Sequence, residues 1–146
     1  TGIGLYGFAN KPLWNSKLQP IASLKTSITQ IHKIKEGEIV GYNCGWKATK
    51  DTKIAVIPIG HADGISRNYG NGTGWVIIKG KKVHMVGNIC MDMTMIEIDQ
   101  IDCKEGDTVI VFGNEPRADN LAEMAGTISY ELLSGLSPRI LRKTIY

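Results

Sequence analysis

Most of the chain alternates apolar and polar residues with the two-residue period of β-strands. The period is clearest in ASLKTSITQIHKI (22–34) and MTMIEID (93–99). KIAVIPI (53–59) and DTVIVFG (107–113) are short apolar runs that predict buried strands. Segment 74–87 predicts a hairpin whose arms join through Lys79, Gly80 and Lys81. Pro58 has no N–H for a strand ladder, so it predicts an edge or a bulge. The similar phrases KEGEIV (35–40) and KEGDTV (104–109) predict turns ahead of strands.

Helical signals are confined to the C-terminal side of the chain. Asp119 or Asn120 can cap LAEMA (121–125), Glu123 lies at capping-box distance from Asn120, and Gly126 ends the segment. TISYELLSG (127–135) predicts a second short helix that Gly135 ends. The predicted fold is therefore mainly β: a small β-barrel-like domain of antiparallel strands, or a sandwich, with a short helical segment near the C-terminus.

Composition describes an ordinary folded domain. The chain has 146 residues, of which 42% are hydrophobic and 21% charged, so one domain is expected and disorder is not. Its longest apolar run, Ile54–Ile59, is too short for a membrane helix, and no signal pattern precedes it. The net charge of +3 is spread out, with clusters only at Lys79–Lys82 and in the tail 139–143. We therefore expect neither a membrane nor a nucleic acid as partner.

Cysteine and histidine offer little chemistry by themselves. The cysteines, Cys44, Cys90 and Cys103, are odd in number and widely spaced, which predicts no disulfide framework and a reducing, cytoplasmic location. Their spacing from one another and from the three histidines (His32, His61 and His84) does not match a zinc site, so no metal is expected. Cys90 is either a nucleophile or a small buried thiol, and the buried thiol is the commoner case.

Two local features leave alternatives open. In GHADGISR, His61 lies close to Asp63 and could act as a titratable pair with it, whereas composition alone favours an Asp-Gly turn. Tyr42 interrupts a strand-like segment between Gly41 and Asn43. It is either a core plug, which local composition favours, or a presented phenol. An isolated phenol is a weak base at neutral pH, so a presented Tyr42 would need a cation from elsewhere.

The opening TGIGLYG resembles the end of a buried strand that enters a glycine-rich turn. It predicts that the chain is a piece of a longer protein.

Six phrases in order resemble the C-terminal domain of alanine racemase. They are GIGLYG, LKTSITQIHKIKEGEIVGYN, IPIGHADGISR, VGNICMDMTMIEI, EGDTVIVFG and LAEMAGTISYELLSGLSPRI. The resemblance implies that residues 1–10 end an N-terminal α/β barrel and that 11–146 form the β-domain. In that family the barrel holds pyridoxal phosphate on a lysine, and two chains pair head to tail to make D-alanine for peptidoglycan. Each active site then joins one chain's barrel to the other chain's β-domain.

The resemblance also implies roles for residues at matching positions. Tyr42 in VGYN matches a catalytic base that acts in the partner subunit's site, and Met91 in CMD matches the backbone amide that binds the substrate carboxylate. Tyr130, Gly2 and Ile3 match the groups that bind the cofactor phosphate of their own chain.

Four further positions match the substrate entrance. Arg67 and Ile128 match residues that line it. His61 replaces a tyrosine that is usual in the family, and Asn88 replaces a common arginine, so the shape and charge of the entrance are expected to differ. The GHADG form also resembles racemase domains fused behind a cell-wall peptide ligase.

Three hypotheses follow for function. The first is an alanine racemase domain, inactive by itself because this chain lacks the cofactor lysine. The second is a racemase for serine or another small amino acid, with His61 as a hydrogen-bonding partner near Cβ. The third is a non-catalytic binding barrel, which only the basic hairpin Lys79–Lys82 supports.

Overall fold

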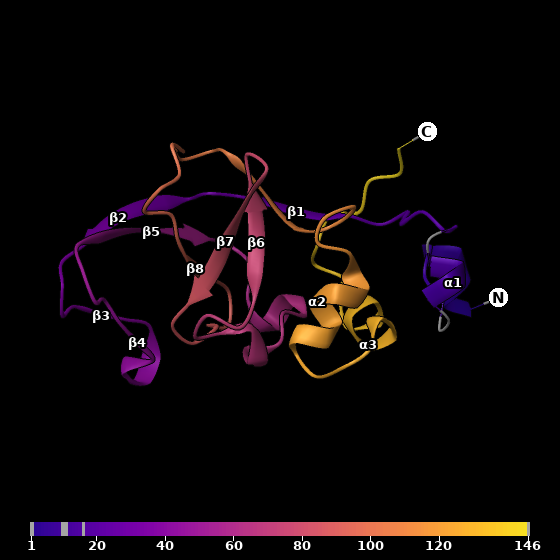
Figure 1. Ribbon diagram of the computed structural model, residues 1–146, viewed down its shortest axis with the longest axis horizontal. Helices are drawn as coiled ribbons and strands as arrows, with labels where there is room; N and C mark the ends of the chain where they lie inside the picture. The colour runs from indigo at the N-terminus through magenta and orange to yellow at the C-terminus, as the bar shows by residue number, and fades with distance from the viewer. Residues whose placement is uncertain (1, 10–11, 16, 146) are drawn as a thin grey trace.

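The computed structural model describes residues 2–9, 12–15 and 17–145 of the chain. Within these residues, seven strands form one antiparallel sheet in the order β1-β9-β6-β7-β8-β5-β2, which curls into a half-barrel (Figure 1). Its strands are β1 (Leu24–Ser27), β2 (Gln30–Ile34), β5 (Thr52–Ile57), β6 (Trp75–Ile78), β7 (Lys81–Val86), β8 (Thr94–Glu97) and β9 (Thr108–Phe112). A separate hairpin pairs β3 (Ile39–Val40) with β4 (Trp46–Lys47).

The helices are short. They are α1 (Pro12–Asn15), α2 (Ala118–Met124) and α3 (Ser129–Ser134), with 3₁₀ turns at Gly2–Tyr6, Tyr42–Cys44, His61–Asp63 and Arg67–Tyr69. The prediction of a mainly β, barrel-like antiparallel domain with a helical segment near the C-terminus is confirmed.

The curl of the sheet comes from one bent strand. Segment 22–34 was predicted as a single strand, but it divides into β1, which pairs with β9, and β2, which pairs with β5. At the bend, Ile28 bonds to the β9 side through the Asp107 carbonyl (3.0 Å), and Thr29 bonds to the Val56 carbonyl of β5 (2.9 Å). Because the two edges of the sheet are consecutive pieces of the same segment, the sheet must curve back toward itself.

Several local predictions match the structure and others do not. The β6–β7 hairpin is confirmed, with Lys79 and Gly80 both at positive φ (48° and 76°) as a tight turn requires. The predicted position of Pro58 at an edge or bulge is wrong. β5 lies between β2 and β8 and ends at Ile57, so Pro58 follows it where no ladder N–H is needed.

The predictions for the start of α2 and for the N-terminal segment also need correction. α2 begins at Ala118 with Arg117 before it, so Asp119 lies in the first helical turn, where its charge suits the helix N-terminus, and is not the cap. Residues 2–6 form a 3₁₀ turn closed by local bonds, such as that from Gly7 N–H to the Gly4 carbonyl, and not the end of a strand. The expected domain boundary between residues 10 and 11 lies outside the described residues.

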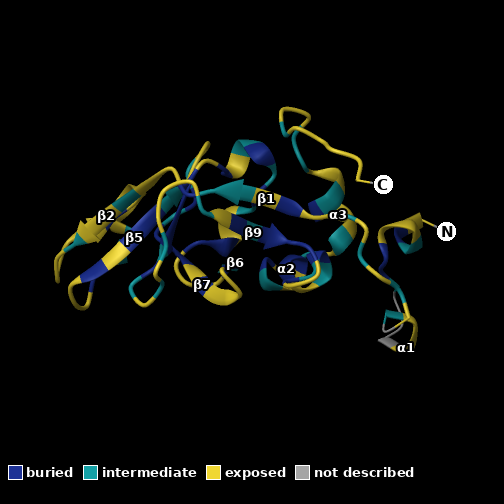
Figure 2. Ribbon diagram, turned by 90° about the horizontal axis from the view of Figure 1, so that it is seen from above, coloured by how far each residue is buried: buried dark blue, intermediate teal, exposed yellow. Residues whose placement is uncertain are grey.

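Apolar side chains pack on both faces of the sheet. The main core fills the space between the sheet and helices α2 and α3, where Figure 2 shows buried residues along β5, β1, β9 and α2. A smaller cluster lies on the other face of the sheet and consists of Val40, Ile54, Val86 and Met95. Val40 belongs to β3, so this cluster fixes the β3–β4 hairpin against β5, β7 and β8.

The N-terminal segment is fixed to α2. The guanidinium of Arg117 donates to the Gly7 carbonyl (3.0 Å) and lies 5.0 Å from the centre of the Phe8 ring. Gly7 has a φ of 86°, and a Cβ there would lie 2.0 Å from the Gln19 carbonyl oxygen, so only glycine fits. These contacts hold the first described residues beside the helical part of the domain.

The end of the chain is fixed by a cluster that we call the Arg139 anchor, made of Arg139, Asp63 and Asp92. Arg139 Nε donates to Asp63 Oδ1 (2.6 Å), and Nη2 donates to Asp92 Oδ1 (2.7 Å). The other Asp63 oxygen accepts from Gly60 N–H at 2.8 Å. The bond from Arg139 lowers the pKa of Asp63, and the Gly60 N–H adds to this effect, although burial opposes it.

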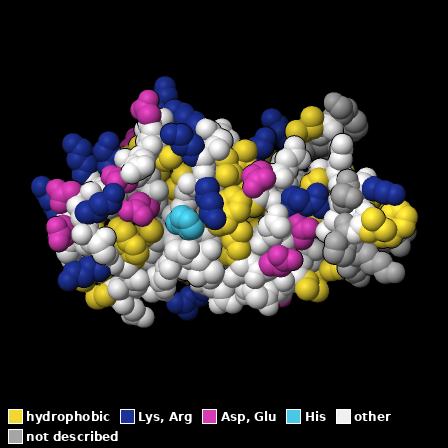
Figure 3. Space-filling view, in the orientation of Figure 1, with side chains coloured by type: hydrophobic (Ala, Val, Ile, Leu, Met, Phe, Trp, Pro, Cys, Tyr) yellow, Lys and Arg dark blue, Asp and Glu magenta, His cyan; other side chains and the backbone are white. Residues whose placement is uncertain are grey.

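The surface charges are mixed. Figure 3 shows lysine and arginine side chains interspersed with acidic ones over the face in view. In the predicted basic hairpin, Lys79 pairs with Asp107 (3.0 Å) and Lys82 lies 4.6 Å from the centre of the Trp75 ring. Among the described residues, no helix is long and apolar enough to cross a membrane.

We predict that Asp63→Asn lowers the free energy of unfolding by about 1–2 kcal/mol at pH 7, because it keeps the size of the side chain but loses the charge-assisted bond. The lowered pKa means that the carboxylate stabilises the fold above about pH 4 and loses this effect as the pH falls through the folded-state pKa. Urea unfolding from pH 7 to pH 3 should therefore show the two proteins converging below about pH 4. Asp92→Asn, at the exposed end of the anchor, is the control; a constant gap across this range would contradict the assignment.

We predict that Tyr69→Phe leaves stability unchanged or raises it by about 0.5–1 kcal/mol. The side chain is 0% exposed, and its hydroxyl has no hydrogen-bond partner among the described residues. Burial raises the pKa of this phenol to about 12, with a smaller effect from the charge of Glu131. Thermal unfolding measures the difference, and a loss above about 1 kcal/mol would mean that the hydroxyl has a partner.

Candidate active site

Tyr42 lies at the tip of the β3–β4 hairpin. Tyr42 is 67% exposed, which decides between the two earlier alternatives: it is presented and is not a core plug. The turn around it is unusual, because Gly41 has a φ of 81° and both Asn43 and Cys44 have a φ of 53°. Residues other than glycine rarely adopt this left-handed conformation, so the turn is held in place by its surroundings.

The surroundings of the turn are residues 87 and 88, directly after β7. A Cβ at Gly41 would lie 3.3 Å from the Asn88 nitrogen and 3.6 Å from Gly87 Cα, so the two backbones are in close contact. The side-chain amide of Asn88 donates to the Tyr42 carbonyl at 2.7 Å. Asn88, predicted at the entrance, is therefore engaged with the Tyr42 turn.

Met91 lies in the loop between β7 and β8, and its side chain is 57% exposed. Its N–H belongs to the same peptide group as the Cys90 carbonyl, which accepts a hydrogen bond from His61 N–H (2.9 Å). The Met91 carbonyl accepts from Ala62 N–H (2.9 Å). No described residue accepts a hydrogen bond from Met91 N–H. The peptide group is thus fixed in direction, and its N–H is available to a ligand. The hydrogen bond to the Cys90 carbonyl polarises this N–H as a donor.

The turn His61–Asp63 orients this peptide, and it does not form the His–Asp pair considered from sequence. Arg139 and Gly60 N–H occupy the Asp63 carboxylate, and Nδ1 of His61 faces the Ile65 carbonyl at 3.4 Å. Gly60 is required here, because a Cβ would lie 2.5 Å from the Cys90 carbonyl oxygen. The Arg139 anchor therefore supports the Met91 amide through the 60–63 turn.

The other entrance residues lie on neighbouring surface turns. His61 and Arg67 are exposed on two successive 3₁₀ turns, and Ile128 is exposed directly before α3. Asn68 donates to the Ala125 carbonyl (2.9 Å), which places the Arg67 turn against the end of α2, three residues before Ile128.

A second group of predicted residues meets near α3. The Tyr130 hydroxyl lies 3.8 Å from the position that a Cβ of Gly2 would take, and Ile3 follows Gly2 in the same 3₁₀ turn. Phenolic O–H and backbone N–H groups are donors from which a phosphate accepts hydrogen bonds. The donor chemistry of Gly2, Ile3 and Tyr130 is therefore of the kind that a phosphate requires.

The two groups are far apart in the molecule. In Figure 1 the β3–β4 hairpin lies at one end of the sheet, and α3 lies beyond the opposite side of β6. Tyr42 and Tyr130 therefore cannot meet on one small ligand within a single chain.

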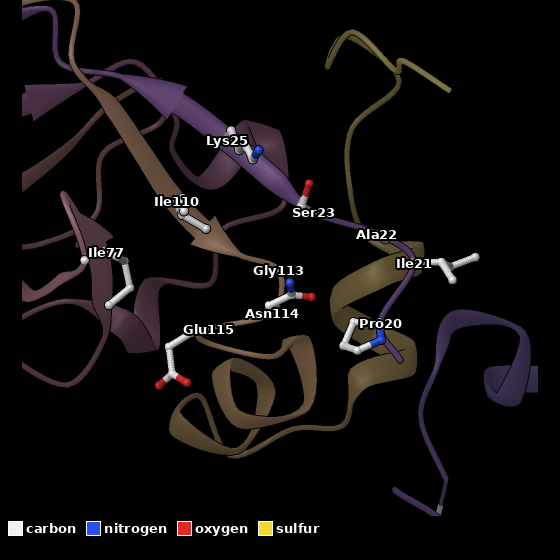
Figure 4. Close-up of a pocket in the computed structure, with 11 residues that line it drawn as sticks. Pro20, Ile21, Ala22, Ser23, Lys25, Ile77, Ile110, Gly113, Asn114 and Glu115 are labelled. Carbon is white, nitrogen blue, oxygen red and sulfur yellow. The ribbon is translucent and has the colours of Figure 1, made fainter. Parts of the chain in front are cut away.

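The best-formed cavity among the described residues does not gather the predicted site residues. This cavity, of about 430 Å³, opens between the segment before β1 and the loop after β9 (Figure 4). Pro20, Ile21, Ile77 and Ile110 contribute to its walls, and none of the predicted site residues lines it. Within the described residues no group of three or more His, Cys, Asp or Glu side chains could hold a metal ion. Burial raises the pKa of Cys90, as expected of an unreactive thiol.

Sequence reasoning missed the contacts that support the site. Arg139 and Asp63 are 76 residues apart, and Asn88 and Tyr42 are 46 apart, so no local spacing signals either contact. The strands β3 and β4 have two residues each, too few for a recognisable alternation.

Residues 21–144 match the family model "Alanine racemase, C-terminal domain". The alanine racemase of Pasteurella multocida is 40% identical over 147 residues, covering 99% of this chain and 41% of that protein. The alanine racemase of Vibrio cholerae is 37% identical, covering 95% of this chain and 39% of that protein. The chain thus spans about two-fifths of the length of these curated relatives.

Solved structures give the same result. The alanine racemase of Acinetobacter baumannii superposes with a TM-score of 0.90 at 36% identity, covering 97% of this chain and 40% of that one. The enzyme of Bartonella henselae, solved with covalently bound pyridoxal phosphate, superposes with a TM-score of 0.90 at 30% identity, covering 99% and 40%. The match spans nearly the whole domain in both sequence and fold, so this chain belongs to the alanine racemase C-terminal domain family.

Proposed function

We propose that this domain supplies part of two active sites in a pyridoxal-phosphate-dependent racemase that interconverts L- and D-alanine for peptidoglycan. Tyr42 and Met91 act in the site of a partner subunit that pairs head to tail. Gly2, Ile3 and Tyr130 bind the cofactor phosphate of their own chain. The observation that supports the proposal is that two sets of groups lie on different parts of the domain. An exposed phenol on the β3–β4 hairpin and an oriented amide in the β7–β8 loop form one set, and a phenolic hydroxyl beside Gly2, near α3, forms the other.

Racemisation requires a proton to leave one face of Cα and another to arrive on the opposite face. Two groups on opposite sides are therefore needed, and Tyr42 is the one that this domain offers. The phenol projects from an exposed turn, where a second chain can approach it. A cation in the partner subunit's site would assist its proton transfer, since a phenol exchanges protons more readily beside positive charge.

Met91 N–H orients the substrate. A carboxylate accepts a strong hydrogen bond from a fixed backbone donor, and this donor needs no rearrangement when the substrate binds. The contact would hold Cα at a constant position relative to Tyr42. The second hypothesis, a preference for serine, required His61 as a hydrogen-bonding partner near Cβ. The His61 ring faces the Ile65 carbonyl of its own turn, so nothing in this contact favours serine over alanine.

The cofactor, when bound, withdraws the electrons left at Cα by proton removal. Tyr130 would donate a hydrogen bond from its hydroxyl to the phosphate, and the backbone N–H groups of Gly2 and Ile3 would donate beside it. We propose further that residues 1–10 end an N-terminal α/β barrel, whose lysine carries the cofactor, and that residues 11–146 form the domain. The 146-residue chain alone should then be inactive even with cofactor added.

In the full-length enzyme that contains this domain, Tyr42→Phe should lower the racemisation rate about a hundredfold or more while the cofactor stays bound. The change removes one exposed oxygen and leaves the packing of the turn intact. Polarimetry or a coupled D-alanine assay measures the rate, and Tyr69→Phe, at the buried tyrosine, is the matched control. A near-normal rate in Tyr42→Phe would reject Tyr42 as the base and make His61 the next candidate.

Tyr130→Phe should weaken cofactor retention about tenfold with little effect on folding, because it removes one charge-assisted hydrogen bond to the phosphate. The dissociation constant of pyridoxal phosphate can be measured by absorbance after dialysis, independently of turnover. Tyr42→Phe serves as the comparison, since Tyr42 is proposed to act at the substrate Cα and not at the cofactor phosphate. Equal retention in Tyr130→Phe and wild type would remove Tyr130 from the phosphate site.

A further inference from the structure

The Tyr42 turn cannot keep its shape by its own bonds. Asn43 and Cys44 are both left-handed (φ 53°), and Gly41 before them has a φ of 81°. Within the turn, one backbone bond, from Gly45 N–H to the Tyr42 carbonyl (3.1 Å), closes the 3₁₀ geometry. Strained residues of this kind persist only where neighbouring groups fix them.

Asn88 provides a side-chain contact of this kind. Its Nδ2 donates to the same Tyr42 carbonyl at 2.7 Å, shorter than the bond within the turn. The approach depends on Gly45, because a Cβ there would lie 2.6 Å from Asn88 Nδ2. The amide therefore occupies space that any other residue at position 45 would fill.

A second asparagine binds the Asn88 side chain. Asn88 Nδ2 donates to the Tyr42 carbonyl, and Asn88 Oδ1 accepts a hydrogen bond from the side-chain amide of Asn71 (3.2 Å). The backbone N–H of Asn71 donates to the Gly87 carbonyl at 2.9 Å, so Asn71 is itself fixed to the segment that carries Asn88. The Tyr42 carbonyl is thus connected through Asn88 to the segment that follows β7.

We propose that Asn88 is a positioning residue for Tyr42: by binding the Tyr42 carbonyl it fixes the direction in which the phenol projects. The inference deepens the proposed function and rests on it. Fixing the carbonyl fixes the peptide plane and hence the Cα–Cβ bond of Tyr42. Proton transfer is sensitive to this direction, since a displacement of about 1 Å can cost about a hundredfold in rate.

The geometry separates this role from that of an entrance residue. The Asn88 amide nitrogen is occupied by the Tyr42 carbonyl, and Asn88 itself is partly buried. A residue that acts only on access would alter substrate binding. A residue that positions the phenol would alter the proton-transfer step that uses it.

The test is Asn88→Asp in the full-length holoenzyme, because aspartate has the same shape but no Nδ2 donor. Asn68→Asp is the matched control: Asn68 also donates to a backbone carbonyl, that of Ala125 at 2.9 Å, away from the Tyr42 turn. The measurement is the primary isotope effect on kcat/KM with L- and D-alanine deuterated at Cα. The equilibrium constant between enantiomers is one, so kcat/KM must fall equally in both directions, whereas the isotope effects are free to differ.

We expect Asn88→Asp to lower kcat/KM about tenfold or more. The isotope effect should rise for the enantiomer whose proton Tyr42 removes and fall for the other, whose proton Tyr42 only returns. A merely structural loss of active enzyme changes neither isotope effect. Asn68→Asp should therefore leave both unchanged, and unchanged isotope effects in Asn88→Asp would overturn the proposal.

Gly45→Ala gives an independent disruption of the same contact if Asn88→Asp folds poorly, and it should produce the same opposite shifts. Tyr42→Phe distinguishes the two levels of the argument. If Tyr42→Phe is fully active, the proposed function of Tyr42 fails and this inference fails with it. If Tyr42→Phe is inactive while both Asn88→Asp and Gly45→Ala keep normal isotope effects, only the positioning role is wrong.

Discussion

The Asp63 carboxylate places one oxygen on the backbone of its own turn, at Gly60 N–H, and the other on the guanidinium of Arg139 near the end of the chain. With only 6% of Asp63 exposed, a charge at this position needs both partners. The turn that it fixes donates to the Cys90 and Met91 carbonyls, and Arg139 also reaches Asp92 beside Met91. One carboxylate therefore determines how the C-terminal segment, the 60–63 turn and the Met91 loop fit together.

The sheet explains why the functional groups divide as they do. Its main core faces α2 and α3, and the N-terminal segment is fixed there through Arg117. The smaller apolar cluster around Val40 holds the β3–β4 hairpin against β5, β7 and β8. Each cluster thus supports a different part of the domain: the smaller one supports the hairpin that carries Tyr42, and the main core supports the helix that carries Tyr130.

Sequence was informative wherever the cause of structure is local. Alternation located most strands of the sheet, and Lys79 and Gly80 marked the hairpin turn. It failed at segment 22–34, because the bend at Ile28 depends on which strand lies beside each half, β9 or β5. It also favoured burial of Tyr42, whose exposure depends on a contact with Asn88 that is 46 residues away. The roles of Tyr42, Met91 and Tyr130 came from the resemblance and stay predictions, whereas the supporting contacts required the fold.

The close approach of Gly45 and Asn88 has a consequence for how this surface can evolve. The absent side chain at position 45 is the space that the Asn88 amide occupies. A lineage that acquires a side chain at position 45 must first give up the amide at 88, and a lineage that replaces the amide no longer needs glycine at 45. The two positions should therefore change as a pair across descendants, with asparagine retained only alongside glycine.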